Sequence, residues 1–162
     1  MATSSTATSS KRSEAATALN ATDWNERASS GSFVTLAGRI LFFAIFVMSG
    51  FMHSSQQEIA YAAKVGVPMA RLLVPASGIL ALTGGLSILL GYRAKTGAWL
   101  LVLFLVPVTL VMHNFWAAGE SMRSQMQMAM FLKNVTMVGG ALLISQFGVG
   151  TLTLDARRDS AR

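Results

Sequence analysis

Four long apolar runs dominate this sequence and constrain its fold more than any other feature. Each run is close to the ~20 residues that a helix needs to cross about 30 Å of hydrocarbon. The runs are Phe33–Met52, Leu72–Gly91, Gly97–Phe115 and Ala129–Phe147. Because backbone polar groups inside a bilayer must be satisfied within the chain, runs this apolar indicate helices rather than barrel strands. The sequence therefore predicts an all-α membrane protein, a bundle of four transmembrane helices.

The composition agrees with a membrane protein and excludes several chemistries. Only 12% of the residues are charged and 52% are hydrophobic, whereas a soluble domain is about a quarter charged. The net charge of +6 comes without a basic block interleaved with aromatics, so a lipid bilayer is the expected partner and nucleic acid is not. The chain has no cysteine, which excludes thiol relays, disulfides and cysteine-based metal centres. No cofactor is intrinsic to the chain, so redox chemistry would need a bound cofactor or a partner.

We divide the chain into three segments. Residues 1–32 are rich in Ser, Thr and Ala, cannot bury a core and lack the apolar centre of a signal peptide, so we expect a disordered cytoplasmic tail. Residues 33–155 form the four-helix domain, and residues 156–162 form a short basic C-terminal tail.

The lysines and arginines predict the orientation in the membrane. Four spans put both termini on one side, together with eight basic residues: Lys11, Arg12, Arg27, Arg93, Lys95, Arg157, Arg158 and Arg162. The opposite side has four: Lys64, Arg71, Arg123 and Lys133. Because basic residues accumulate on the cytoplasmic side, we expect both termini in the cytoplasm and a multi-pass protein of the bacterial inner membrane.

The first loop on the outer side carries signals for a short helix. Ser55 and Glu58 have the spacing of a capping box, and Gly66 followed by Pro68 supplies a stop. We predict a short interfacial helix over Gln56–Val65. The polar segment Ala117–Met128 predicts no particular structure.

The predicted topology gathers a set of polar side chains at the outer end of the bundle. They are His53 at the end of the first run, His113, Asn114 and Trp116 at the end of the third, and Lys133 and Asn134 near the start of the fourth. Ionisable groups in membrane segments usually face the bundle interior or a wet cavity and mark a site. We therefore take this set as the candidate functional site.

Each member of the set also has a structural interpretation. His113 is either a proton carrier, because imidazole titrates near neutrality, or a residue satisfied by a backbone carbonyl or by snorkelling. His53 is a second candidate proton carrier. Trp116 is either an interfacial anchor or part of the site. Lys133 either extends outward to the membrane surface or, with Asn114 and Asn134, holds an anionic headgroup or a quinone oxygen.

Arg39 lies at the opposite end of the bundle, six residues into the first apolar run. A lone arginine there needs water or an acid. Asp155, just past the fourth run, is the natural acid on that side. We predict an Arg39–Asp155 pair with a mainly structural role.

Two further groups of residues have structural explanations. Gly84, Gly85, Gly139 and Gly140 have the small size that lets helices approach closely. Thioethers suit Cu(I), but methionine is also a flexible filler of apolar helices, and we predict no metal site. The methionines in question are Met122, Met126, Met128 and Met130.

A set of short motifs from Ala37 to Asp155 resembles the DoxX family of small bacterial membrane proteins. In order they are GRILFFAIFVMSG, VGVP, GGLSILLGYRAKTGAWLL, HNFW, FLKN, GGALLI and GVGTLTLD. The resemblance implies a four-helix membrane protein linked to quinone-dependent oxidation of sulfur compounds and to membrane complexes against oxidative stress. It implies that these residues occupy family-typical positions: Arg39, His113, Asn114, Phe131, Lys133, Asn134 and Asp155. His53 and Ala81 depart from the family, which often has a lysine and a glutamate there.

Three functions compete at this point. The first is a quinone-interacting component of a membrane redox or oxidative-stress system, an oxidoreductase subunit without an electron carrier of its own. The second is a non-enzymatic scaffold that holds a soluble or membrane redox enzyme. The third is a small solute carrier. Glycine-lined helix faces are compatible with a monomer or a homo-oligomer.

Overall fold

A computed structural model describes residues 32–53, 55–117, 122–150 and 152–159. Within these residues the chain is helical, with short connections and no strand. The expected N-terminal tail, apart from Ser32, lies outside the described residues. The last three residues of the expected C-terminal tail lie outside them too.

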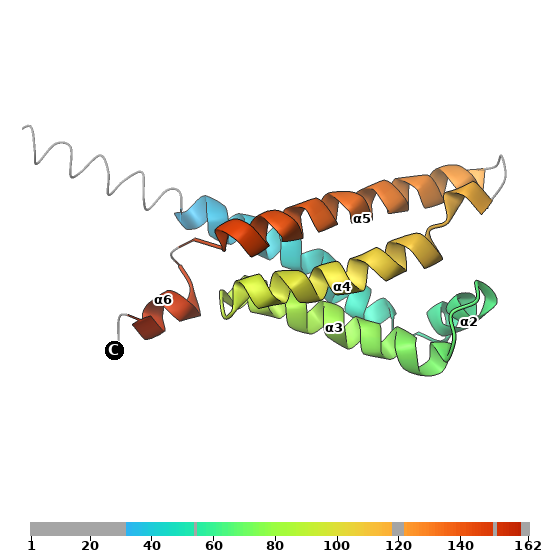
Figure 1. Cartoon of the computed structure of the whole chain (residues 1–162), viewed down its shortest axis with the longest axis horizontal. Coiled ribbons are helices and arrows are strands. Elements are labelled where there is room, and N and C mark those ends of the chain that lie inside the picture. Colours follow the sequence, from blue (N-terminus) through green and yellow to red (C-terminus); the bar gives the residue numbers. More distant parts are fainter. Residues whose placement is uncertain (1–31, 54, 118–121, 151, 160–162) are drawn as a thin grey trace, which may run out of the picture.

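Four helices are long and apolar enough to cross a membrane in the described part of the chain. They are the first helix (Ser32–Met52), α3 (Ala70–Leu90), α4 (Ala94–Met112) and α5 (Met122–Phe147). Three short helices complete the fold: α2 (Gln56–Lys64), the 3₁₀ helix Phe115–Ala117 and α6 (Leu154–Asp159). Figure 1 shows α2 at one end of the long helices and α6 at the other. We call these the α2 end and the α6 end. The predicted class, a four-helix transmembrane bundle with a short helix after the first span, is confirmed.

The fourth long helix begins earlier than its apolar run. It starts at Met122, whereas the run starts at Ala129. The extra residues, Met122–Met128, include four polar residues and so fall outside the apolar run. Met, Arg and Gln, which make up most of the segment, are good helix formers. Hydropathy indicates which residues contact lipid and does not indicate where a helix begins. The apolar run therefore missed the first turns of α5.

The short helix α2 follows its sequence signals closely. The side chain of Ser55 accepts a hydrogen bond of 3.2 Å from the backbone N–H of Glu58, as the N-cap of a helix does. The chain leaves the helix after Lys64, and Gly66 has a φ of +93°, in the left-handed region that favours glycine. The predicted interfacial helix is confirmed.

The four long helices form a closed ring. α4 packs along both α3 and α5. Gly85 of α3 lies against Phe43 and Phe46 of the first helix, and Gly140 of α5 lies against Phe42. At the centre are the largest fully buried side chains, Phe46, Ile88, Leu101 and Leu105.

Many large apolar side chains point outward from this ring. Leu41, Leu103 and Phe147 are 75%, 63% and 83% exposed. A soluble protein rarely leaves so much apolar surface in contact with water, whereas lipid tails cover it at no free-energy cost. The chain is therefore a multi-pass membrane protein in contact with a bilayer.

Candidate functional site

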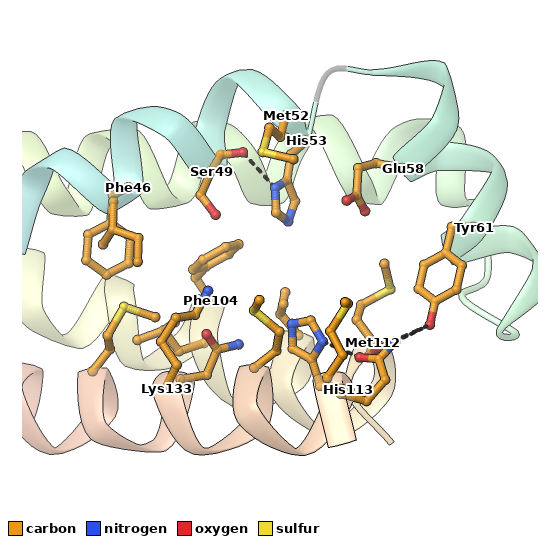
Figure 2. Close-up of a pocket in the computed structure, with 18 residues that line it drawn as sticks. Phe46, Ser49, Met52, His53, Glu58, Tyr61, Phe104, Met112, His113 and Lys133 are labelled. Carbon is orange, nitrogen blue, oxygen red and sulfur yellow. Dashed lines mark hydrogen bonds between the residues drawn. The ribbon is translucent and has the colours of Figure 1, made fainter. Parts of the chain in front are cut away.

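A cavity of about 300 Å³ opens among the first helix, α2, α4 and α5 at the α2 end (Figure 2). We call it the polar cavity because polar side chains line much of it: Ser49, His53, Glu58, Tyr61, His113, Gln127, Lys133 and Asn134. Methionines and aromatics supply most of the remaining wall, with five thioethers from Met52, Met112, Met126, Met130 and Met137. The volume is at the lower end of the range for small-molecule sites.

A chain of hydrogen bonds ties α2 to the long helices at the mouth of the polar cavity. The amide nitrogen of Gln127 donates to the Tyr61 hydroxyl at 3.1 Å, and that hydroxyl donates to the backbone carbonyl of Met112 at 3.3 Å. The amide oxygen of Gln127 lies 2.8 Å from Nδ1 of His113. Because that oxygen can only accept, Nδ1 carries the hydrogen, and in the neutral ring Nε2 is left as an acceptor.

His53 is held in the same tautomer by a different partner. Its Nδ1 lies 2.7 Å from the carbonyl oxygen of Ser49, so Nδ1 donates. Its ring packs edge-on against Phe104, with the ring centroids 5.4 Å apart. Figure 2 shows the ring of His53 pointing from the end of the first helix into the cavity. Its Nε2 is therefore available to a ligand that can donate a hydrogen bond.

Lys133 and Asn134 enter the cavity from α5. Lys133 lies about 16 Å along the helix from Met122, and Figure 2 shows its side chain extending toward Phe104 rather than along α5. Asn134 is only 4% exposed, and within the described residues no group hydrogen-bonds to its side-chain amide. Within the described residues, every side-chain nitrogen or oxygen that is fully buried has a hydrogen-bond partner. The Asn134 amide has no partner there, so it is not fully buried, and because Asn134 lines the polar cavity its amide has access to the cavity space. The two N–H donors and the carbonyl oxygen of this amide can therefore hydrogen-bond to a polar group that enters the cavity.

Four of the residues expected at the site meet in the polar cavity, and two do not. His53, His113, Lys133 and Asn134 line it. Asn114 and Trp116 do not. Trp116 is 59% exposed and packs edge-on against Phe115 and Phe131, with centroid distances of 5.2 and 5.9 Å. That position agrees with the interfacial-anchor interpretation of Trp116.

Sequence reasoning missed Glu58, Tyr61 and Gln127. Gln127 had a signal, because Gln127, Met130, Asn134 and Met137 follow the spacing of one helix face, but the face is recognisable only once α5 is known to begin at Met122. Glu58 and Tyr61 lie one turn apart on α2. Which side of α2 faces the bundle depends on the connections around it.

Replacing Gln127 with leucine should loosen α2 without unfolding the bundle. The change removes the hydrogen bonds to His113 and Tyr61, so we expect amide hydrogens of α2 to exchange about tenfold faster, equivalent to ~1.4 kcal/mol. Hydrogen–deuterium exchange with mass spectrometry measures this. Gln125→Leu, on an exposed position of the same helix, is the control. Equal exchange rates in the two variants would show that the chain of hydrogen bonds does not hold α2.

Arg39 and Asp155 have different partners from those expected. Arg39 is 5% exposed and donates to the carbonyls of Ile88 (2.9 Å), Leu89 and Leu152 (2.6 Å). Asp155 accepts from the backbone N–H of Arg93 at 2.7 Å. The expected ion pair between them is absent from these described residues. The physical reason is that carbonyls of the last turn of α3 and of the segment before α6 converge on Arg39, and a guanidinium with five donors can bond to all of them.

The methionines gather differently from the sequence grouping. Met126 and Met130 line the polar cavity, whereas Met122 and Met128 do not. Among the described residues, no three His, Cys, Asp or Glu side chains are grouped to hold a metal ion. The absence of a metal site stays a prediction.

Fold and cavity together define a class: a multi-pass α-helical membrane protein with a polar cavity at one end of its bundle. A family model, the SURF4 family, matches residues 3–160, so the chain belongs to the SURF4 family.

The chain is also similar to several individual membrane proteins. The chain is 28% identical over 125 residues to the inner membrane protein YphA of Escherichia coli, covering 75% of this chain and 88% of YphA. It is 30% identical over 124 residues to the Escherichia coli inner membrane protein YqjF, covering 74% and 88%. A Surfeit locus protein 4 homolog of Schizosaccharomyces pombe is 27% identical over 128 residues, covering 78% of this chain and 38% of that protein. No solved structure matches the chain significantly.

The match corrects the resemblance drawn from short motifs. Nothing in the comparisons indicates DoxX, so the expected membership of that family is wrong. Short motifs such as GGALLI recur among apolar helices because lipid contact restricts their composition, and they discriminate poorly between families. The match to the SURF4 family also contradicts the three functions expected from sequence, which are quinone redox chemistry, a scaffold for a redox enzyme and a solute carrier. The oxidoreductase and oxidative-stress assignments also lack support.

Proposed function

We propose that this chain is a membrane receptor, similar in type to a cargo receptor, that binds the polar part of its ligand in the polar cavity. One observation carries the proposal: the amide of Asn134, buried and without a partner in the described residues, has access to the cavity. The amide offers two N–H donors and one carbonyl acceptor at the cavity wall. A ligand with a complementary polar group can hydrogen-bond to them there.

The charges around the cavity support selective binding of a polar group. Lys133 supplies a cation, Glu58 a carboxylate, and the two histidines supply Nε2 acceptors in their neutral form. These groups come from four different helices. A ligand that satisfies them together is therefore recognised by its shape as well as its charge.

The packing beyond the cavity favours capture of a ligand over passage through the bundle. Phe46 and Leu105 belong to the cavity wall, Leu101 is fully buried in the same core cluster, and α3 and α4 touch at Gly84 and Gly97. A polar ligand in the cavity would have to cross this apolar region to reach the α6 end.

The basic residues and the relatives support one orientation and one membrane. Arg93 and Lys95, together with Arg157 and Arg158 of α6, lie at the α6 end, which we assign to the cytoplasm. The polar cavity then faces the outer side. Two relatives are named inner membrane proteins of Escherichia coli, which supports the bacterial inner membrane as the location.

Replacing Asn134 with leucine should abolish ligand retention while leaving the fold intact. We expect wild-type protein, released from mild detergent into a native mass spectrometer, to carry a one-to-one adduct that Asn134→Leu loses about tenfold or more. The thermal stability of the variant should change little, because within the described residues the Asn134 amide makes no hydrogen bond that leucine would remove.

Ser145→Ala is the matched control for that experiment. Ser145 is also buried on α5, but its hydroxyl bonds to the Leu142 carbonyl of its own helix, outside the polar cavity. The control should keep the adduct. Equal adduct in wild type and Asn134→Leu would show that the cavity is not the binding site.

A further inference from the structure

A second cavity, of about 370 Å³, lies next to the polar cavity and is almost wholly apolar. We call it the apolar cavity. The connection Gly66–Pro68 forms one side of it, α3 contributes Leu73 and Val74, and α4 contributes Pro107 and Val111. Its polar wall groups are His53 and Ser77, and the Ser77 hydroxyl is already bonded to the Val74 carbonyl.

The two cavities share a wall. His53, Val108 and Met112 line both of them. His53 is held by Ser49 and Phe104, whereas the Met112 side chain is unbranched and adaptable. A single ligand that displaces the Met112 side chain can therefore contact the polar groups on one side of His53 and the apolar groups on the other.

The apolar cavity also borders the lipid-facing surface. Leu73 and Val111 line it and are 45% and 40% exposed. Both lie in the turn at the α2 end of a helix long and apolar enough to span a membrane, so this side of the cavity opens toward the edge of the bilayer. A hydrocarbon chain can enter from the bilayer without crossing water.

From this arrangement we propose that the ligand is an amphiphile of the phospholipid type, with a zwitterionic head in the polar cavity and an acyl chain in the apolar cavity. The proposal rests on the proposed receptor function and names its ligand class. A phosphate accepts from Lys133 and Asn134 on α5, and an ammonium group faces Glu58 on α2. One cation and one carboxylate on different walls match a head that carries both charges.

The experiment is a competition on the intact chain. Purified protein in maltoside micelles receives equal amounts of a lysophosphatidylethanolamine and of an alkyl glucoside with the same chain length. Native mass spectrometry then compares their adducts. We expect the lysophospholipid adduct to exceed the glucoside adduct at least about tenfold in the wild type, because only its head pairs with Lys133 and Glu58.

Two variants test whether the acyl chain of the ligand binds in the apolar cavity. Val111→Phe and Ser77→Leu add bulk to the wall of the apolar cavity and should each lower the lysophospholipid adduct about tenfold, as excluding two methylenes from an apolar site would. Leu103→Phe adds bulk to an outward position of α4 outside the cavity and should change nothing. Retention of the adduct in both cavity-filling variants overturns the proposal.

Binding of glycerophosphoethanolamine, which is the lipid head group without its acyl chain, distinguishes this proposal from the receptor function. If it binds as tightly as the lysophospholipid and depends on Asn134, the receptor function stands and the amphiphile proposal falls. If lysophospholipid and glucoside bind equally, the apolar cavity holds only bulk lipid, and the proposal also falls. Loss of the ligand adduct described for Asn134→Leu tests the receptor function independently of any lipid probe.

Discussion

Arg39→Leu should be among the most destabilising substitutions in this protein, lowering its free energy of unfolding by about 3–5 kcal/mol. The side chain donates to carbonyls of Ile88, Leu89 and Leu152 from a buried position. Leucine would leave these acceptors without that donor at the junction of α3 with the segment before α6. Unfolding in mixed micelles, followed by tryptophan fluorescence, measures the loss.

Two controls separate this mechanism from the ion pair expected from sequence. Arg157→Leu removes an exposed arginine at the same end and should change the free energy of unfolding by less than about 0.5 kcal/mol. Asp155→Asn keeps an oxygen that accepts from the Arg93 N–H, so its loss should be under about 1 kcal/mol. A loss with Asp155→Asn as large as that with Arg39→Leu would restore the ion pair.

Gly97→Leu should separate α3 from α4 and cost about 3 kcal/mol or more. A Cβ at Gly97 would lie 2.6 Å from the Ser87 side chain and 2.8 Å from the carbonyl oxygen of Gly84, which is backbone and cannot turn aside. The same unfolding measurement applies. We also expect a smaller yield of folded protein on size exclusion.

Gly139→Leu is the matched control, because nothing lies within 4 Å of a Cβ at that glycine. It should be neutral or stabilising, since leucine forms helices better than glycine. Equal losses at Gly97 and Gly139 would mean that loss of glycine itself, rather than the α3–α4 contact, destabilises the fold. From the sequence we interpreted Gly84, Gly85, Gly139 and Gly140 as residues that let helices approach closely. Gly139 has no neighbouring helix close to it in the described residues.

Helix number and type could be predicted from the sequence because hydropathy accumulates locally along each run. The short helix α2 was also predictable, since Ser55 caps it through a neighbour three residues away and Gly66 ends it. The beginning of α5 was not. Met122–Met128 lack the apolar signal, and their helical state shows only in the structure.

The candidate site was predictable in part for a topological reason. His53 and His113 lie at span ends, and Lys133 and Asn134 lie near the start of the fourth apolar run, which four antiparallel crossings bring to the same side. Their shared cavity also required each helix to be rotated so that these residues face inward. Asn114 lies next to His113 in sequence and yet does not line the cavity, so a position near a span end does not by itself select the cavity residues.

By itself the sequence determined that the chain crosses a bilayer four times, where α2 lies and which polar residues gather at one end. These properties follow from transfer free energies and caps that act over a few neighbouring residues. The tertiary structure alone decided that Arg39 binds carbonyls rather than Asp155, that Gln127 joins His113 to Tyr61, and that Asn134 faces a cavity. Those outcomes depend on how the helices rotate and approach one another, and contacts between distant residues set that geometry.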